Sequence, residues 1–189
     1  MPTLQRGETR QTWSTLLPSV RQNQQGRMHE GLLAKEVEMI AIDPGVAGGW
    51  AYDMEHGAIE CCRMPETDGD ILTGLRNLWA VGHREIRMEI PAKAIFGAGH
   101  SSLAVLHRNV GFIQGVAMSL GFSLLLVQPK KWQKVIGIAK RPGEEQRKWK
   151  NRLKEEAQRR FPNLHITLST ADAVLILAAG LAAKNQTRQ

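Results

Sequence analysis

The chain has 189 residues and a formal net charge of +7, with 25 Lys and Arg against 18 Asp and Glu, and only two cysteines. This length suits one domain with a substantial core plus a tail; no apolar run reaches the roughly 18 residues that span a bilayer, and the N-terminus lacks the apolar stretch of a secretory signal. Cys61 and Cys62 are adjacent, which fits no zinc motif, and together with the missing signal this leads us to expect an intracellular protein in a reducing compartment.

The two halves of the chain differ in charge. Residues 1–92 contain 9 basic and 13 acidic residues, a net charge of −4, whereas residues 93–189 contain 16 and 5, a net charge of +11. A basic field of this size attracts polyanions, of which nucleic acid is the commonest. A solvated basic helix surface explains such a charge run about as well, so charge alone leaves both interpretations open.

Residues 1–36 are rich in Gln, Arg, Ser and Thr and have no sustained hydrophobic period. We expect a flexible or weakly helical arm there, followed by a single domain over residues 37–189. The arm could be a DNA tether, an extension upstream of a second start at Met28, or an Arg-rich targeting segment.

From Glu36 onward, hydrophobic periodicity predicts a regular order of strands and helices. The predicted strands cover residues 36–43, 49–54, 58–64, 85–90 and 122–127. The predicted helices cover residues 70–80, 101–120, 130–136, 144–161 and 171–183. This order predicts an α/β fold with a mixed five-stranded sheet, three antiparallel strands followed by parallel additions, flanked by helices.

Three acidic residues stand where apolar segments begin or end. Asp43 closes the first strand, Glu89 lies near the end of the fourth, and Asp172 lies in the first turn of the last helix. Carboxylates so placed can converge on a hard cation, which prefers oxygen ligands. Each also has an ordinary interpretation, as a turn initiator, an ion-pair partner or a residue favoured by the helix dipole. Together, in this order, they predict a metal site.

The segments IAIDPGVAGGWAY, MEIP and ADAVLILAAG, in this order and spacing, resemble the RuvC-type Holliday junction resolvases of the RNase H-like superfamily. The segments HSSLAVLHRNVGFIQGVAMSLGF and VQPKKWQKVIG are similar to the bacteriophage and organellar branch of that family. The resemblance covers about residues 37–183. It implies an RNase H-like fold and a homodimeric, Mg²⁺-dependent endonuclease that resolves four-way DNA junctions by paired phosphodiester hydrolysis. It also implies the cytoplasm of a bacterium or of a phage-infected host, or an organelle, as the location.

The resemblance also implies roles for single residues. Asp43 would bridge two Mg²⁺ ions, for which Mn²⁺ could substitute, while Glu89 and Asp172 would each support one ion. Family members commonly have a fourth acid about one turn before the last one, where this chain has Leu168 and Ser169. Ser169 and His165 are therefore candidate accessory residues, and reduced or absent nuclease activity stays open.

Further residues are expected to contact DNA. The loop Lys93–Ser102 has glycines and serines that would let backbone amides approach phosphates. Three lysines flank Trp132, for which we expect a buried ring with the lysines facing DNA. The helix from residue 144 has a basic surplus that intrahelical pairs explain only in part. The predicted DNA-binding residues are Lys93, Ser101, Ser102, Lys130, Lys131, Lys134, Arg147, Lys148, Lys150 and Arg152.

The helix over residues 101–120 is the best candidate for a twofold interface, because Gly111 and Gly115 would let another helix pack closely. Its apolar stripe could instead be buried within one chain. Two other functions remain open: a non-catalytic protein that binds branched DNA, suggested by Ser169, and an RNase H-like nuclease acting on RNA–DNA hybrids or flaps. An actin-like or sugar-kinase-like ATPase would need two lobes and a far longer chain, and no membrane partner is expected.

Overall fold

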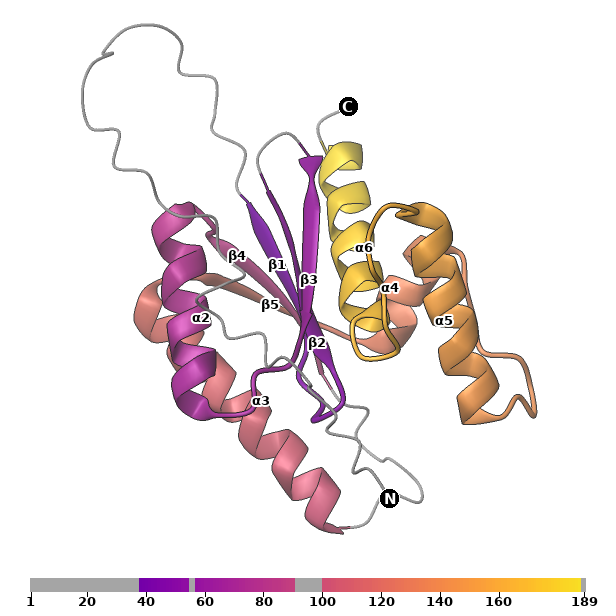
Figure 1. The fold of residues 1–189 in the computed structure, drawn as a ribbon, viewed down its shortest axis with the longest axis horizontal. Coiled ribbons are helices and arrows are strands. Elements are labelled where there is room, and N and C mark those ends of the chain that lie inside the picture. Colours follow the sequence, from indigo (N-terminus) through magenta and orange to yellow (C-terminus); the bar gives the residue numbers. More distant parts are fainter. Residues whose placement is uncertain (1–37, 55–56, 91–99, 188–189) are drawn as a thin grey trace, which may run out of the picture. The chain divides into compact units, whose positions relative to one another are not determined.

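The computed structural model describes residues 38–54, 57–90 and 100–187, with the side chains of residues 100–102 and 187 left out of that description (Figure 1). The predicted arm and Lys93 therefore lie outside the described residues. The strands are β1 (Met39–Asp43), β2 (Gly49–Asp53), β3 (Ile59–Arg63), β4 (Glu85–Glu89) and β5 (Ser123–Val127). The helices are α2 (Asp68–Val81), α3 (His100–Leu120), α4 (Pro129–Ile136), α5 (Gln146–Arg160) and α6 (Ala171–Thr187).

The five strands form one mixed sheet in the order β3-β2-β1-β4-β5. β1 pairs with β2 and β2 with β3 in antiparallel fashion, whereas β4 is parallel to β1 and β5 is parallel to β4. Short connections suffice for the antiparallel strands, and helices α2 and α3 provide the crossovers that parallel strands require. The predicted fold class is confirmed.

Helices cover both faces of this sheet. In Figure 1, α2 and α3 lie against one face and α4, α5 and α6 against the other. Side chains alternate along β1, so that Met39 and Ala41 join the apolar cluster of the α6 layer while Ile40 and Ile42 point to the opposite face. Both sets are fully buried, which explains why β1 is nearly continuous in apolar residues.

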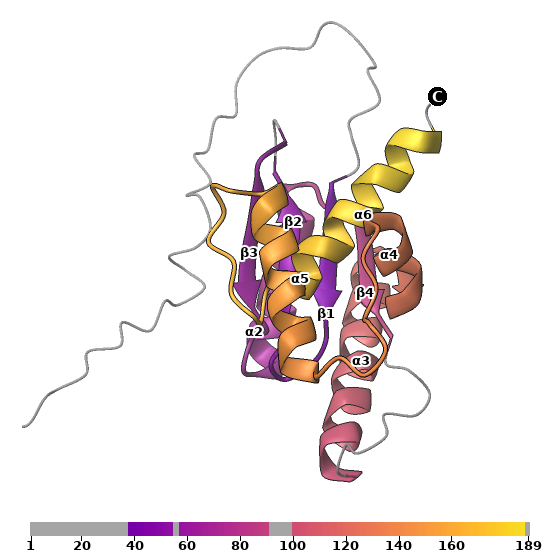
Figure 2. The same cartoon turned by 90° about the vertical axis from the view of Figure 1, so that its right-hand side faces the viewer.

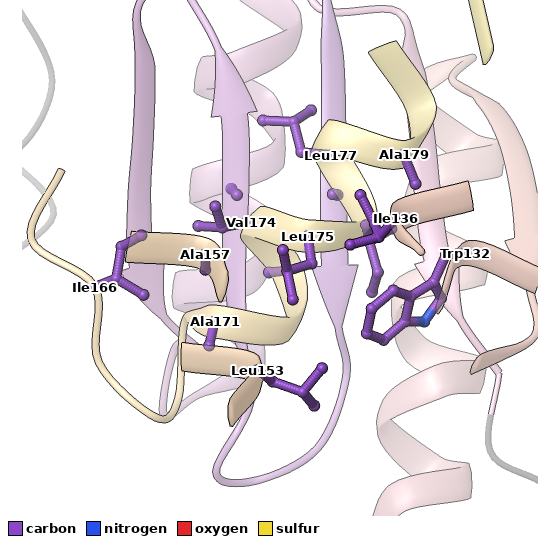
Figure 3. Packing of buried hydrophobic residues seen from close by; sticks show 14 of the residues in the cluster. Trp132, Ile136, Leu153, Ala157, Ile166, Ala171, Val174, Leu175, Leu177 and Ala179 are labelled. Atoms are coloured by element: carbon purple, nitrogen blue, oxygen red, sulfur yellow. The ribbon is translucent and has the colours of Figure 1, made fainter. Parts of the chain in front are cut away.

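Helix α6 is the centre of the second layer. Residues 171–177 are all buried, because the sheet lies on one side of α6 and α4 and α5 lie on the other (Figures 2 and 3). A helix enclosed in this way is apolar all round rather than amphipathic. Within the described residues, no helix combines the length and apolar character needed to cross a membrane.

Every predicted strand and helix occurs within the described residues, with shifts at the ends. The largest shift is in α6, which continues four residues past the predicted end to Thr187. Lys184 in that last turn forms an ion pair with Glu85 of β4 at 3.0 Å, a tertiary contact that periodicity does not reveal.

Candidate functional site

The pairing of β1 with β4 brings Asp43 and Glu89 to the same end and the same face of the sheet. In this parallel register Ile42 lies beside Met88, so the next residue of each strand is an acid. Both acids continue the alternation of Met39 and Ala41, and they therefore point towards the α6 layer.

The turn between β1 and β2 lets the N-terminus of α6 approach these acids. A Cβ atom on Gly48 would collide with the carbonyl oxygen of Asp43, and one on Gly49 would lie 2.7 Å from the carbonyl oxygens of Cys62 and Ser169. The last two glycines of PGVAGG thus permit close packing of backbone on backbone. Asp172, in the first turn of α6, is 5% exposed at the edge of this contact.

Substituting Gly49 with alanine is expected to lower the free energy of unfolding by about 2–3 kcal/mol, because rigid backbone on both sides blocks the added methyl group. Urea denaturation would measure the loss. Gly69→Ala in α2 is the control, since a Cβ atom there would meet nothing closer than the Thr67 hydroxyl oxygen at 3.7 Å and alanine favours a helix. Equal stability of the two variants would contradict this account of the turn.

The carboxyl groups interact with one another. Burial, reinforced by the charge of Asp172, raises the pKa of Asp43, although Lys150 and the amide of Gly45, which donates to Oδ1 at 3.1 Å, oppose the shift. Burial and the nearby Asp43 raise the pKa of Glu89 to about 8. Three acids from three elements therefore interact electrostatically in one buried cluster. Raised pKa values of this kind are typical of sites that bind a positively charged group.

Lys150 supplies such a charge from α5. Its ammonium lies 2.6 Å from Oδ2 of Asp172, and the lysine side chain is 36% exposed against 7% for Asp172. Burial acts to lower the pKa of Lys150, but Asp172, Asp43 and Glu89 together raise it. We predicted that Lys150 would bind DNA; in the structure its ammonium is instead bound to an acid of the cluster.

The acids suit a divalent cation in their chemistry, although they do not enclose one in this arrangement. Within the described residues, no three His, Cys, Asp or Glu side chains are spaced to hold one metal ion. Oδ1 of Asp172 is buried without a hydrogen-bond partner, an uncompensated acceptor that a cation could satisfy. The Lys150 ammonium thus stands where positive charge is needed, and the all-oxygen donor set matches Mg²⁺ or Mn²⁺.

Trp132 of α4 is a further member of the site. Its ring is 3% exposed, as we predicted, and its Nε1–H donates to Oε2 of Glu89 at 2.6 Å. The sequence placed lysines around this residue but contained no signal for a bond to an acid 43 positions away.

The raised pKa of Glu89 makes the metal-free fold less stable as pH rises. The unfolded carboxyl group ionises near its ordinary value of 4.5, whereas the folded one keeps its proton to about 8, so stability falls between these values. We expect Glu89→Gln to show a smaller decline in melting temperature between about pH 5 and about pH 8 in EDTA. Glu66→Gln, on the exposed surface, should follow the wild type. An equally steep decline in Glu89→Gln would contradict this prediction.

Neither of the two candidate accessory residues forms a hydrogen bond with the acids in the part of the chain that the structure describes. His165 is exposed, and its carbonyl oxygen accepts a hydrogen bond from Cys61 on the edge strand β3. Ser169 lies with its carbonyl oxygen against Gly49, and its side chain has no hydrogen bond within the described residues. The side chains that do form hydrogen bonds with the acids are those of Lys150 and Trp132.

The predicted DNA-binding residues fall into three groups. Lys130, Lys131 and Lys134 are exposed on α4, and Arg147 and Lys148 are exposed on α5. Arg152 is engaged internally, because it binds Glu144 at 2.8 Å and stacks on Trp149 at 5.3 Å. The structure does not describe Lys93 or the side chains of Ser101 and Ser102, and places the latter two residues in the first turn of α3.

No family model matches the sequence, and no curated protein is similar to it in sequence. Solved structures are similar in fold. One is "T. thermophilus RuvC in complex with Holliday junction substrate", with a TM-score of 0.54, 13% identity, and coverage of 79% of this chain and 96% of that chain. Another is "Thermus thermophilus RuvC structure", with a TM-score of 0.53, 12% identity, and coverage of 80% and 97%.

A third solved structure, Fowlpox virus resolvase with substrate Holliday junction DNA, has a TM-score of 0.43 and 14% identity over 81% of this chain and all of the other, and adds nothing to the fold argument. The sheet order, the helices on its two faces and the match to both Thermus thermophilus structures agree with the resemblance seen in the sequence. The chain has the RNase H-like fold of these two RuvC structures.

Proposed function

We propose that this protein is a metal-dependent, structure-selective endonuclease that resolves four-way DNA junctions by paired phosphodiester hydrolysis. The observation that carries the proposal is the buried cluster of Asp43, Glu89 and Asp172 at one end of an RNase H-like sheet. Two of these acids have raised pKa values, and the third is paired with Lys150 through Oδ2 but has an unsatisfied buried Oδ1; perturbed acids of this kind are candidates for a functional site.

Asp43, Glu89 and Asp172 would hold the divalent ions, Mg²⁺ or Mn²⁺. When bound, two such ions activate water, neutralise the phosphate and stabilise the leaving oxygen. Asp43 could hold these ions while its Oδ1 still accepts the amide of Gly45, because each carboxylate oxygen has two lone pairs. Lys150 would release Asp172 and bind the phosphate of the DNA, because an ammonium on a flexible stem can exchange one anionic oxygen for another.

The exposed lysines of α4 and the basic residues of α5 would hold the DNA backbone beside the acids. Both helices belong to the layer into which the acids point. Phosphate contacts of this type position the DNA without reading its sequence, which agrees with recognition of a branched shape. We therefore propose branched DNA as the partner.

The exposed face of α3 would form a homodimer, so that two sites meet opposite strands of a junction. Val110, Ile113 and Val116 are buried within the chain, which takes up the apolar stripe. Gly111 and Gly115 are exposed on another face, and Met118 one turn further is 72% exposed. A flat glycine surface beside a large exposed apolar side chain supports packing against a second copy.

Met118→Glu is expected to convert a dimer into a monomer and to replace paired cuts with single nicks, since a charge would be buried at the twofold axis. Light scattering after gel filtration measures the mass. Val81→Glu, which puts the same charge on an exposed apolar position of α2, should leave the mass unchanged. A wild type that is monomeric at all concentrations and with DNA bound would remove the dimer from the proposal.

The proposed function is tested by cleavage of a labelled mobile four-way junction beside linear duplex and RNA–DNA hybrid, with Mg²⁺, Mn²⁺ or EDTA. Symmetric paired nicks that appear only on the junction and only with metal are the expected result. Preferential cutting of the hybrid would instead identify an RNase H-like nuclease.

A second candidate function is non-catalytic binding of branched DNA. It is favoured by Ser169 at the place of the fourth acid and by the ion pair between Lys150 and Asp172. Such a protein would bind junctions equally well in EDTA and Mg²⁺ and would produce no nicks.

A further inference from the structure

We propose that Trp132 is a positioning residue that binds one carboxylate oxygen of Glu89 and thereby fixes the orientation in which this acid meets a cation. This role rests on the proposed function, since it concerns the same acids. The contact behind it joins Nε1 of Trp132 to Oε2 of Glu89 at 2.6 Å, with the ring 3% exposed.

The ring has little freedom to move. Trp132 belongs to the apolar cluster of the α6 layer and lies beside Ile136, one turn further along α4 (Figure 3). Gly137, which follows the last residue of α4, has a left-handed backbone conformation. Its amide donates to the carbonyl oxygens of Gln133 and Lys134 and so closes the last turn. The indole is therefore presented by a short helix that is fixed at its C-terminus and through its buried face.

The chemistry of the two groups sets the direction of the bond. An indole N–H can only donate and a carboxylate oxygen accepts, so the bond is strongest to the ionised acid. A glutamate has a flexible side chain whose two oxygens can both bind a cation. With Oε2 bound to the indole, the carboxylate of Glu89 is held in one orientation, which is how outer partners usually orient metal ligands.

A purely structural tryptophan in the same cluster provides the comparison. Trp149 of α5 is 5% exposed and belongs to the same apolar cluster as Trp132. Within the described residues its ring contacts the guanidinium of Arg152 and its indole nitrogen donates to no acid. A buried indole N–H usually finds some hydrogen-bond partner; for Trp132 that partner is an acid of the cluster, whereas for Trp149 it is not.

The contact is tested first without metal or DNA, by the indole N–H resonances in a ¹⁵N spectrum. The Trp132 signal is identified by its absence from Trp132→Phe. In Glu89→Ala that signal should move and exchange with solvent at least tenfold faster, while the Trp149 signal stays in place. A Trp132 signal unaffected by Glu89→Ala overturns the proposal, whatever the protein does to DNA.

The positioning role is tested by titration with Mn²⁺ alone, following the free ion by electron paramagnetic resonance. Trp132→Phe should weaken Mn²⁺ binding about tenfold, the lower end of the usual effect of removing an outer partner, and Trp149→Phe should not change it. Both variants keep an aromatic ring in the core, so a loss confined to Trp132→Phe is not explained by poorer packing.

The outcomes separate this role from the proposed function. If the wild type cuts junctions but Trp132→Phe binds Mn²⁺ as tightly, the positioning role fails and the nuclease stands. If both tryptophan variants weaken Mn²⁺ binding equally, Trp132 serves packing alone and the proposal is overturned. If the wild type binds no Mn²⁺, the proposed function fails and this role fails with it.

Discussion

Asp43→Asn is expected to lower metal-dependent junction cleavage by about a thousandfold or more while leaving junction binding intact. The amide has nearly the shape of the carboxylate and can still accept the hydrogen bond from Gly45 through one oxygen. It has no charge, and its nitrogen cannot bind a cation. Cleavage should therefore be lost because a charge is lost, without a change in the turn.

The position of Asp43 explains why the charge of its carboxylate matters for cleavage. It lies between Glu89, its neighbour across the parallel strands, and Asp172, whose charge raises its pKa further after burial. In the proposed function Asp43 would help to hold both ions, so that removing its charge would weaken metal binding more than removing an acid that helps to hold one.

Single-turnover cleavage with saturating enzyme would measure the effect, and junction affinity in Ca²⁺ would be measured separately. Asp53→Asn is the matched control: Asp53 also ends a strand, and burial raises its pKa too, but its carboxylate accepts the amide of Met39 at the opposite end of β1. If Asp43→Asn cleaves as fast as wild type, the acids are structural and the nuclease proposal is wrong.

Lys150→Met should lower the free energy of unfolding by about 2 kcal/mol without divalent metal, and Mg²⁺ should restore most of that loss. The lysine stem packs much as methionine does, so the main change is the loss of a charge. Asp172 would then be buried with both oxygens unpaired, since Oδ1 already lacks a partner. The estimate is kept below that for a fully buried pair because the lysine is partly exposed.

The same substitution is expected to slow junction cleavage by about a hundredfold at saturating Mg²⁺, because the phosphate loses its cationic partner at the site. If Mg²⁺ restores stability while cleavage stays slow, the ammonium of Lys150 takes the place of a metal ion. A lysine that only stabilised the packing of α5 against α6 would not be replaced by Mg²⁺.

Chemical denaturation in EDTA and in Mg²⁺ measures the first effect. Lys148→Met on the same helix is the control, because its ammonium is exposed and lies 3.7 Å from Glu145 on the surface. It should lose little stability in either buffer. The interpretation is wrong if Lys150→Met is as stable as the wild type in EDTA, or if Mg²⁺ does not stabilise it. Lys150 would then not neutralise the negative charge of the acids.

The amino-acid sequence by itself determined the order and type of the elements and the fold class. Those features depend on local periodicity and on turn chemistry: β1 is buried on both faces and reads as a continuous apolar run, and PGVAGG has the glycines that its tight turn requires. Asp43, Glu89 and Asp172 could be selected because acids at the ends of buried segments stand out, and because the resemblance placed them in one family pattern.

Only the tertiary structure decided which side chains surround those acids. In the sequence, Lys150 is one basic residue of a charged helix, and nothing there indicates an acid 22 residues away as its partner. Trp132 is an aromatic residue among lysines, and nothing there indicates its bond to an acid 43 residues away. Contacts over such distances depend on how α4 and α5 pack around α6, and packing is set by the shapes of side chains from several elements at once. His165 shows the converse, since its place in the sequence suggested the site and the fold put it beside β3.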